Sequence, residues 1–197
     1  MRRDEIDRRK RRFLIAAASL VGSAAAAGAA VPFAASLAPS ERAKAAGAPV
    51  ELDIANLAPG QLKITARRGK PVWVMRRSDE MLADIREDDA LVSDPRSEVP
   101  QQPRYAKNEF RSIDPRILVL VGVCTHLGCS PQFRPADAKD ELGPTWNGGF
   151  YCPCHGSKFD LAGRVLRGSP APTNLVVPPY QLVNGGTIII GEDRKSA

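Results

Sequence analysis

A chain of 197 residues with a net charge of +6 has room for one compact domain beside a membrane anchor. The positive charge gathers in residues 1–12, which hold seven basic and three acidic residues, so everything after them carries only +2. Such a nearly balanced body is unlike the basic surface of a nucleic-acid-binding protein, and we expect no nucleic-acid partner.

The apolar run that follows has the length of a membrane span. Residues 13–40 contain no charged residue over 28 positions, and about 20 apolar residues are enough to cross a bilayer core. The basic residues before the run predict a cytoplasmic N-terminus by the positive-inside rule. Lys10-Arg11-Arg12-Phe13-Leu14 is similar to a twin-arginine export signal, whereas Ala24-Ala25-Ala26 would also suit a cleaved secretory signal. Composition alone leaves the anchor and the cleaved signal equally open.

Residues 38–49 (APSERAKAAGAP) have the composition of a linker, because they are small and weakly charged. Ala, Glu, Arg and Lys also favour helix, so this segment could instead continue the N-terminal helix. From Val50 onward the pattern becomes short and β-like, and we place the head domain at residues 50–197.

Short runs that alternate apolar and polar residues, and short apolar runs between turn residues, predict β-strands in the head. The predicted strands cover residues 51–54, 62–65, 71–76, 116–123, 180–183 and 187–190. Asn184-Gly185 would close the last pair as a hairpin, and Asn147-Gly148 predicts a hairpin turn just before Phe150. Ser78 is a suitable N-cap for a short helix over residues 79–86.

Two short boxes contain all 4 cysteines and both histidines of the chain. They read Cys124-Thr125-His126-Leu127-Gly128-Cys129 and Cys152-Pro153-Cys154-His155-Gly156-Ser157. A Cys-x-His box paired with a Cys-x-x-His box supplies two thiolates and two imidazoles, which is the ligand set of a Rieske [2Fe–2S] centre.

Two simpler explanations of the boxes remain open from the residues alone. A structural zinc ion could take Cys124, Cys129, Cys152 and His155. That choice leaves His126 and Cys154 without a role. Two plain disulfides in an exported domain would use the four cysteines but neither histidine.

The two boxes, together with the downstream Gly168-Ser169-Pro170-Ala171-Pro172, resemble the Rieske iron–sulfur subunit of bacterial cytochrome bc complexes, the ubiquinol–cytochrome c reductases. The downstream segment looks like the proline loop of that family. The resemblance covers nearly the whole chain. It implies an all-β fold: a Rieske-type antiparallel β-sandwich head with an inserted cluster-binding subdomain at about residues 120–173, after one N-terminal transmembrane helix.

The resemblance also implies how the chain is arranged in the cell. Residues 1–12 would be cytoplasmic, residues 13–37 would stay as an uncleaved anchor, and residues 38–49 would form a flexible hinge. The head would lie in the periplasm, attached to the bacterial inner membrane by this single pass. A disulfide in the head agrees with that oxidising compartment.

By motif matching, one [2Fe–2S] cluster would be held by Cys124, His126, Cys152 and His155. The two remaining cysteines, Cys129 and Cys154, would form the disulfide of the family.

Four further roles follow from the same resemblance. His155 would face the quinol and accept its electron and proton. Leu127 and Gly128 would form the exposed tip that docks on the membrane subunit. Ser157 would donate a hydrogen bond to the cluster, and Phe159 would lie near the cluster.

The implied function is electron transfer from quinol to a c-type cytochrome by movement of the head. The partners would be a cytochrome b subunit and a c-type cytochrome subunit in a dimeric complex, and the chain alone would be inactive. A Rieske subunit of another periplasmic oxidase, such as arsenite oxidase, is the main alternative. A soluble Rieske ferredoxin is a weaker one, because such proteins generally lack the extra cysteine pair and the anchor.

The chain departs from the family pattern in two places. The 25 residues between His126 and Cys152 are more than usual, and the excess falls in Pro131–Thr145, which its polar, Pro-rich composition predicts to be a surface loop. Phe159 occupies a position where many members have Tyr, so a hydroxyl that could donate to a ligand sulfur is missing.

Overall fold

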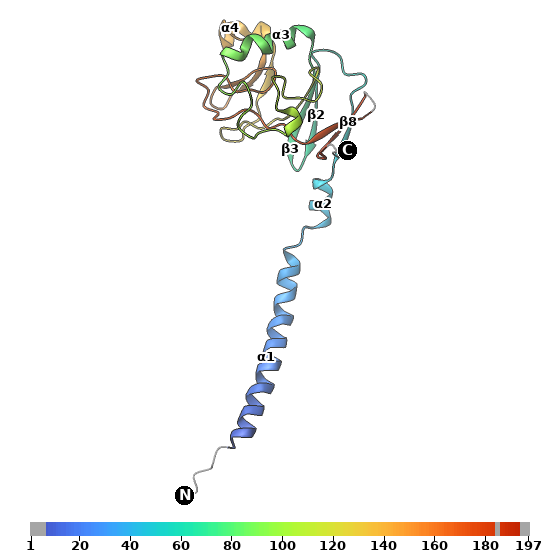
Figure 1. Ribbon diagram of the computed structural model, residues 1–197, viewed down its shortest axis with the longest axis vertical. Helices are drawn as coiled ribbons and strands as arrows, with labels where there is room; N and C mark the ends of the chain where they lie inside the picture. The colour runs from blue at the N-terminus through green and yellow to red at the C-terminus, as the bar shows by residue number, and fades with distance from the viewer. Residues whose placement is uncertain (1–6, 184–185, 194–197) are drawn as a thin grey trace. The chain divides into compact units, whose positions relative to one another are not determined.

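The computed structural model describes residues 7–183 and 186–193, and the chain divides into two units, residues 1–45 and 46–197. The first unit contains a long helix, α1 (Arg8–Ser36), which is exposed along its whole length (Figure 1). It is long and apolar enough to cross a membrane. The helix begins before the apolar run, because the Asp7 side chain accepts hydrogen bonds from the backbone N–H groups of Arg9 and Lys10 and so caps it.

A second helix, α2 (Glu41–Gly47), occupies most of the segment with linker composition. Ser40 Oγ accepts a hydrogen bond from the Ala43 N–H (3.2 Å), and Lys44 pairs with Glu41 at 2.7 Å. Residues 41–47 are therefore helical, but in a helix separate from α1, which ends at Ser36, and not in a continuation of it. The flexibility of residues 38–49 stays a prediction.

In the described part of the head, the strands form three antiparallel sheets of three strands each. The first contains β1 (Val50–Asp53), β9 (Thr187–Ile190) and β8 (Tyr180–Val183), in that order. The second contains β2 (Leu62–Arg67), β3 (Lys70–Arg76) and β4 (Ile117–Val121). The third contains β5 (Gln132–Arg134), β6 (Gly149–Cys152) and β7 (Ser157–Phe159). All six predicted strands are confirmed with shifts of one or two residues, and the turn at Asn184-Gly185 lies outside the described residues.

Short helices complete the head. They are α3 (Asp79–Glu87), α4 (Lys139–Leu142) and the 3₁₀ turns η1 (Asp88–Ala90), η2 (Arg104–Ala106) and η3 (Ala136–Ala138). The predicted cap of α3 is confirmed, since Ser78 Oγ accepts from the Met81 N–H at 3.3 Å. Antiparallel sheets after an apolar N-terminal helix agree with the expected fold, although the head is not purely β.

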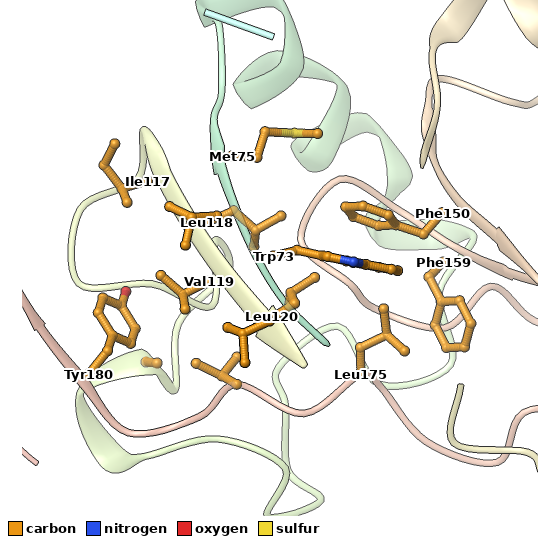
Figure 2. Packing of buried hydrophobic residues seen from close by; sticks show 14 of the residues in the cluster. Trp73, Met75, Ile117, Leu118, Val119, Leu120, Phe150, Phe159, Leu175 and Tyr180 are labelled. Carbon is orange, nitrogen blue, oxygen red and sulfur yellow. The ribbon is translucent and has the colours of Figure 1, made fainter. Parts of the chain in front are cut away.

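The first box follows strand β4, which pairs with β3. Four residues of each are buried, and the Trp73 ring on β3 stacks on Phe150 of β6 at 4.8 Å between centroids (Figure 2). Trp73 also lies directly over Gly122, where a Cβ atom would meet the indole at 2.2 Å. Only glycine fits there, and it lies two positions before the first residue of the first box.

The prediction of a hairpin turn at Asn147-Gly148 is wrong. The strand before it, β5, pairs with β6 across residues 135–148, which include η3 and α4. The Asn147 side chain instead donates a hydrogen bond to Asp88 Oδ1 at 2.9 Å. This contact joins residues far apart in the chain, so a local turn signal cannot reveal it.

The predicted surface loop at residues 131–145 contains regular structure, which corrects that prediction. Besides β5 and α4, it contributes Ala138 and Leu142 to a small separate core around Trp146. Lys158 Nζ on β7 donates to the Leu142 carbonyl at 2.5 Å. The extra residues are therefore packed against the strand that follows the second box.

The wild-type protein is expected to become less stable as the pH rises from about 4 to above 6, because Asp88 ionises. The Asp88→Asn variant, which cannot ionise at this position, should not show this decline. Burial, followed by the nearby Asp160 carboxylate, raises the pKa of Asp88 from 3.8 to about 6. Because the folded pKa exceeds the unfolded one, protonation favours the folded state. This stability is present below about pH 4 and is lost as the pH rises through about 6. Denaturant unfolding of the two proteins across this range measures it, and an equally steep decline in Asp88→Asn would contradict it.

Candidate metal centre

The two cysteine–histidine boxes are loops that leave neighbouring strands of the core. The first begins two residues after β4, and the second connects β6 to β7. Cys152 ends β6 and Ser157 begins β7, and these two residues lie opposite each other in the antiparallel register. Each box is therefore anchored by a strand whose side chains are buried.

Both boxes close with the same backbone turn. The Gly128 N–H donates to the Cys124 carbonyl at 3.0 Å, and the Gly156 N–H donates to the Cys152 carbonyl at 2.9 Å. Both glycines have left-handed backbones, with φ of 86° and 78°. Glycine is the residue that adopts this conformation without strain, so the fifth residue of each box is explained by the turn.

A disulfide joins Cys129 to Cys154, with 6.6 Å between the Cα atoms. Within the first box, the Cys124 N–H donates to the Cys129 carbonyl at 2.7 Å. The two loops are thus cross-linked beside the remaining two cysteines, Cys124 and Cys152, which are free and buried.

The four predicted metal ligands form two contacting pairs, one of thiols and one of imidazoles. Cys124 and Cys152 are 3% and 2% exposed, and the rings of His126 and His155 meet edge to face with 4.8 Å between centroids. Nδ1 of His126 is buried and has no hydrogen-bond partner among the described residues. A buried, unpartnered ring nitrogen in a box that also contains a free, buried thiol fits a metal centre, because a metal ion would satisfy it.

Burial raises the pKa of the Cys152 thiol, and the neighbouring Cys124 thiol adds to the rise. A buried thiol of this kind stays protonated in the absence of a cation, and metal binding releases its proton. The sulfurs of Cys129, Cys152 and Cys154 also lie within 4.8 Å of one another. Two of these three form the disulfide, so Cys152 is the member of this group with a free thiol.

The proline loop contacts both boxes. Thr125 Oγ1 donates to the Thr173 carbonyl at 2.6 Å, and Ser157 Oγ accepts from the Ala171 N–H at 3.1 Å. The Ser157 side chain is fully buried, and its own hydroxyl proton remains available to a further acceptor. Sequence reasoning named this loop but missed Thr125, because nothing in the order of residues shows that it faces residue 173.

The remaining predicted site residues differ in exposure. Leu127 is 71% exposed, and Gly128 and His155 are also exposed. Phe159 is fully buried, opposite Phe150 in the sheet register and close to it in Figure 2. The exposed part of the site therefore lies on the two loops, and Phe159 lies in the core behind them.

Strand-borne cysteine–histidine loops around two buried thiols define a Rieske [2Fe–2S] protein, and a family model described as "Rieske [2Fe-2S] domain" matches residues 50–181. A second, described as "Ubiquitinol-cytochrome C reductase Fe-S subunit TAT signal", matches residues 1–40. The chain belongs to the family of ubiquinol–cytochrome c reductase iron–sulfur subunits.

Relatives of that name match almost end to end. The subunit from Allochromatium vinosum is 58% identical, with 98% of this chain and 93% of the relative covered. The one from Blastochloris viridis is 38% identical, with 95% and 96% covered. A chain of a solved "Hyperthermophilic respiratory Complex III" is 29% identical, with 89% and 98% covered and a TM-score of 0.46, too low to carry weight beside the sequence matches.

Proposed function

We propose that this chain is the electron-transfer subunit of a quinol–cytochrome c oxidoreductase, accepting an electron from quinol and passing it to a c-type cytochrome. The observation that carries the proposal is the pair of cross-linked boxes with two buried free thiols and an unpartnered His126 Nδ1. The names of its relatives favour this enzyme over arsenite oxidase. Acting alone, the chain would turn over nothing.

Four residues would hold the cluster: Cys124, His126, Cys152 and His155. When bound, a cluster with two imidazole ligands supplies one-electron chemistry at roughly −150 to +300 mV, against roughly −400 mV for plant-type ferredoxins. The exposed His155 ring would face the quinol and take its proton on the ring nitrogen that does not hold iron. His126 would use its buried Nδ1 for the metal.

The exposed tip supports a docking role. Leu127 places a largely exposed apolar side chain beside Gly128, which has no side chain to obstruct a partner. We propose that this tip docks on a cytochrome b subunit, within a complex that also contains a c-type cytochrome and is dimeric.

The arrangement in the membrane follows from α1. We propose that residues 13–37 form an uncleaved anchor in the bacterial inner membrane, with residues 1–12 cytoplasmic and the head periplasmic. The charge-free run after five consecutive basic residues, Arg8–Arg12, supports this orientation. Residues 38–49 would serve as the hinge.

We also propose that about residues 120–173 form a cluster-binding subdomain inserted in a β-sandwich head. The strands around the second box, β5 to β7, make a sheet of their own. The strands before and after this stretch, β4 and β8, belong to the two other sheets. An insertion between strands of the main head accounts for that topology.

Purifying the membrane complex through a tag on this chain tests the proposal. The expected result is co-purification of a cytochrome b and a c-type cytochrome, with a Rieske EPR signal after reduction. Zinc in place of iron, or an oxidase without cytochrome b, would contradict it.

Stiffening the hinge is expected to lower quinol-to-cytochrome turnover while the cluster stays spectroscopically intact. Several prolines inserted within residues 43–48 would interrupt α2 and favour an extended, rigid chain. The same number of inserted alanines, which keep helix propensity, is the control for added length. Unchanged turnover in the proline variant would mean that the head does not move about this segment.

Phe159→Tyr is expected to raise the midpoint potential by tens of millivolts. A hydroxyl donating to a ligand sulfur stabilises the more negative, reduced state. Hydrogen bonds to charged groups contribute about 1.5–3 kcal/mol. If the two redox states differ by about 1 kcal/mol, one-electron conversion gives roughly 40 mV.

Ser157→Ala should have the opposite effect and lower the midpoint potential, because it removes a hydroxyl that would donate to the cluster. Redox titration measures both variants, and a crystal structure locates the new hydroxyl. No rise in Phe159→Tyr, with the hydroxyl confirmed near a ligand sulfur, would falsify the hydrogen-bond account.

A further inference from the structure

Arg111 is a fully buried arginine whose hydrogen bonds join the two ends of one loop that is distant from it in the sequence. Its Nη1 donates to the carbonyls of Ala162 and Gly163, both at 3.2 Å, just before the proline loop. Its Nη2 donates to the carbonyl of Leu175 at 2.7 Å, just after that loop. One guanidinium therefore spans both ends of the segment that contains Gly168–Pro172.

The same two ends also bond directly to each other. The Leu175 N–H donates to the Gly163 carbonyl at 2.8 Å, and the Val165 N–H donates to Asn174 Oδ1 at 2.9 Å. Asn174 is itself buried, and its Nδ2 donates to the Asp94 carbonyl at 3.1 Å. Residues 163–175 thus form a closed loop, and we call its hydrogen-bonded base the neck.

The far part of this loop contacts the two cluster boxes. The Ala171 N–H donates to Ser157 Oγ in the second box, and the Thr173 carbonyl accepts from Thr125 Oγ1 in the first. Both contacts are made by backbone groups of the loop. Their position is therefore set by how the neck holds the loop.

We propose that Arg111 is a positioning residue of the electron-transfer site: by closing the neck, it fixes the proline loop and, through Ala171, the direction of the Ser157 hydroxyl. The inference rests on the proposed function, because Ser157 matters only if a cluster is present. Lysine cannot replace arginine here, since one ammonium does not have the planar fork that reaches carbonyls on both sides.

The charge of the guanidinium persists at neutral pH. Burial lowers the pKa of Arg111 to about 10, and the nearby Asp160 and Asp94 carboxylates oppose that fall. The hydrogen bonds that Arg111 donates to the neck are therefore charge-assisted, which makes them stronger than bonds between neutral groups.

Arg77 provides a matched control within the same fold. It is also fully buried, and it donates to the carbonyls of Phe110, Pro115 and Leu161 and to Ser112 Oγ. None of these acceptors belongs to residues 163–175, the loop that the neck closes. Arg77→Lys should therefore cost stability as Arg111→Lys does, without affecting the proline loop.

The test compares Arg111→Lys, Arg77→Lys and wild type in the purified complex. We expect Arg111→Lys to increase amide hydrogen exchange in the peptide covering residues 168–175 at least tenfold and to lower the midpoint potential. Arg77→Lys should lower the thermal unfolding temperature with neither change. If Arg111→Lys does not assemble, Asn174→Ala takes its place with the same expected shifts, because it removes the bond from Val165 within the neck and the bond that ties the neck to Asp94.

If amide exchange and the midpoint potential in Arg111→Lys equal those of wild type, the positioning role is overturned. The same holds for Asn174→Ala where that variant replaces Arg111→Lys. Equal shifts in Arg77→Lys would overturn it too, since they would show a general effect of buried arginines. A missing Rieske EPR signal in the wild-type complex overturns the proposed function instead, and the exchange measurement does not depend on that signal.

Discussion

Replacing any one of the four proposed ligands is expected to abolish the cluster. The substitutions are Cys124→Ser, His126→Ala, Cys152→Ser and His155→Ala. Each leaves an iron with an open or weaker position in a site where the structure offers two buried thiols and two adjoining imidazoles. Iron content per chain and the EPR spectrum of the reduced protein measure the loss, which should be nearly complete.

Leu127→Ala is the control, because this side chain lies in the same loop, is largely exposed and is not a proposed ligand. Its EPR signal should persist. A normal Rieske signal in any one of the four ligand variants would remove that residue from the ligand set. Loss of iron without loss of the folded head would support the assignment; because Cys124 and Cys152 are also part of the main core, a circular dichroism spectrum should confirm that each variant is folded.

Removing the disulfide should leave a cluster that is less stable, more open to solvent and altered in potential. In the double variant Cys129→Ala/Cys154→Ala, the two boxes lose their covalent link across a sequence separation of 25. In the chain-entropy account, a loop of this length contributes about 3.5 kcal/mol. Thermal unfolding, iron retention under a chelator and redox titration measure the effect.

Wild-type protein treated with a thiol reductant is the matched comparison, because it breaks the same bond and changes no side chain. The two should behave alike. If the double variant matched untreated wild type in iron content, potential and unfolding temperature, the disulfide would have no role in holding the cluster loops.

Much of the local structure could be predicted from the sequence because its cause is local. Alternation along residues 62–67 matches the side-chain period of a strand, and the short apolar run at 117–121 is typical of a fully buried strand. Ser78 accepts a hydrogen bond from a backbone group three residues away, so the start of α3 can be predicted from the sequence. The concentration of every cysteine and histidine in two boxes identified the candidate ligands in the same way.

The errors arose where distant residues compete with a local signal. Asn147-Gly148 has the pattern of a hairpin turn, yet Asn147 bonds to Asp88, which is 59 positions away. Residues 131–145 have the composition of a loop, yet they fold because Trp146 offers them an apolar surface to cover. In both cases the partner that decides the conformation is absent from any short window.

The sequence by itself determined the candidate ligand types, the strands and an apolar run long enough to span a membrane, since each depends on residue chemistry or on spacing within a few positions. Only the tertiary structure decided how the ligand loops are held. Arg111 and Leu175, 64 residues apart, meet at the neck of the proline loop, and Thr125 meets Thr173 across 48 residues. These contacts form because the packed core brings buried carbonyls within reach of donors, and a buried carbonyl left unpaired would be costly.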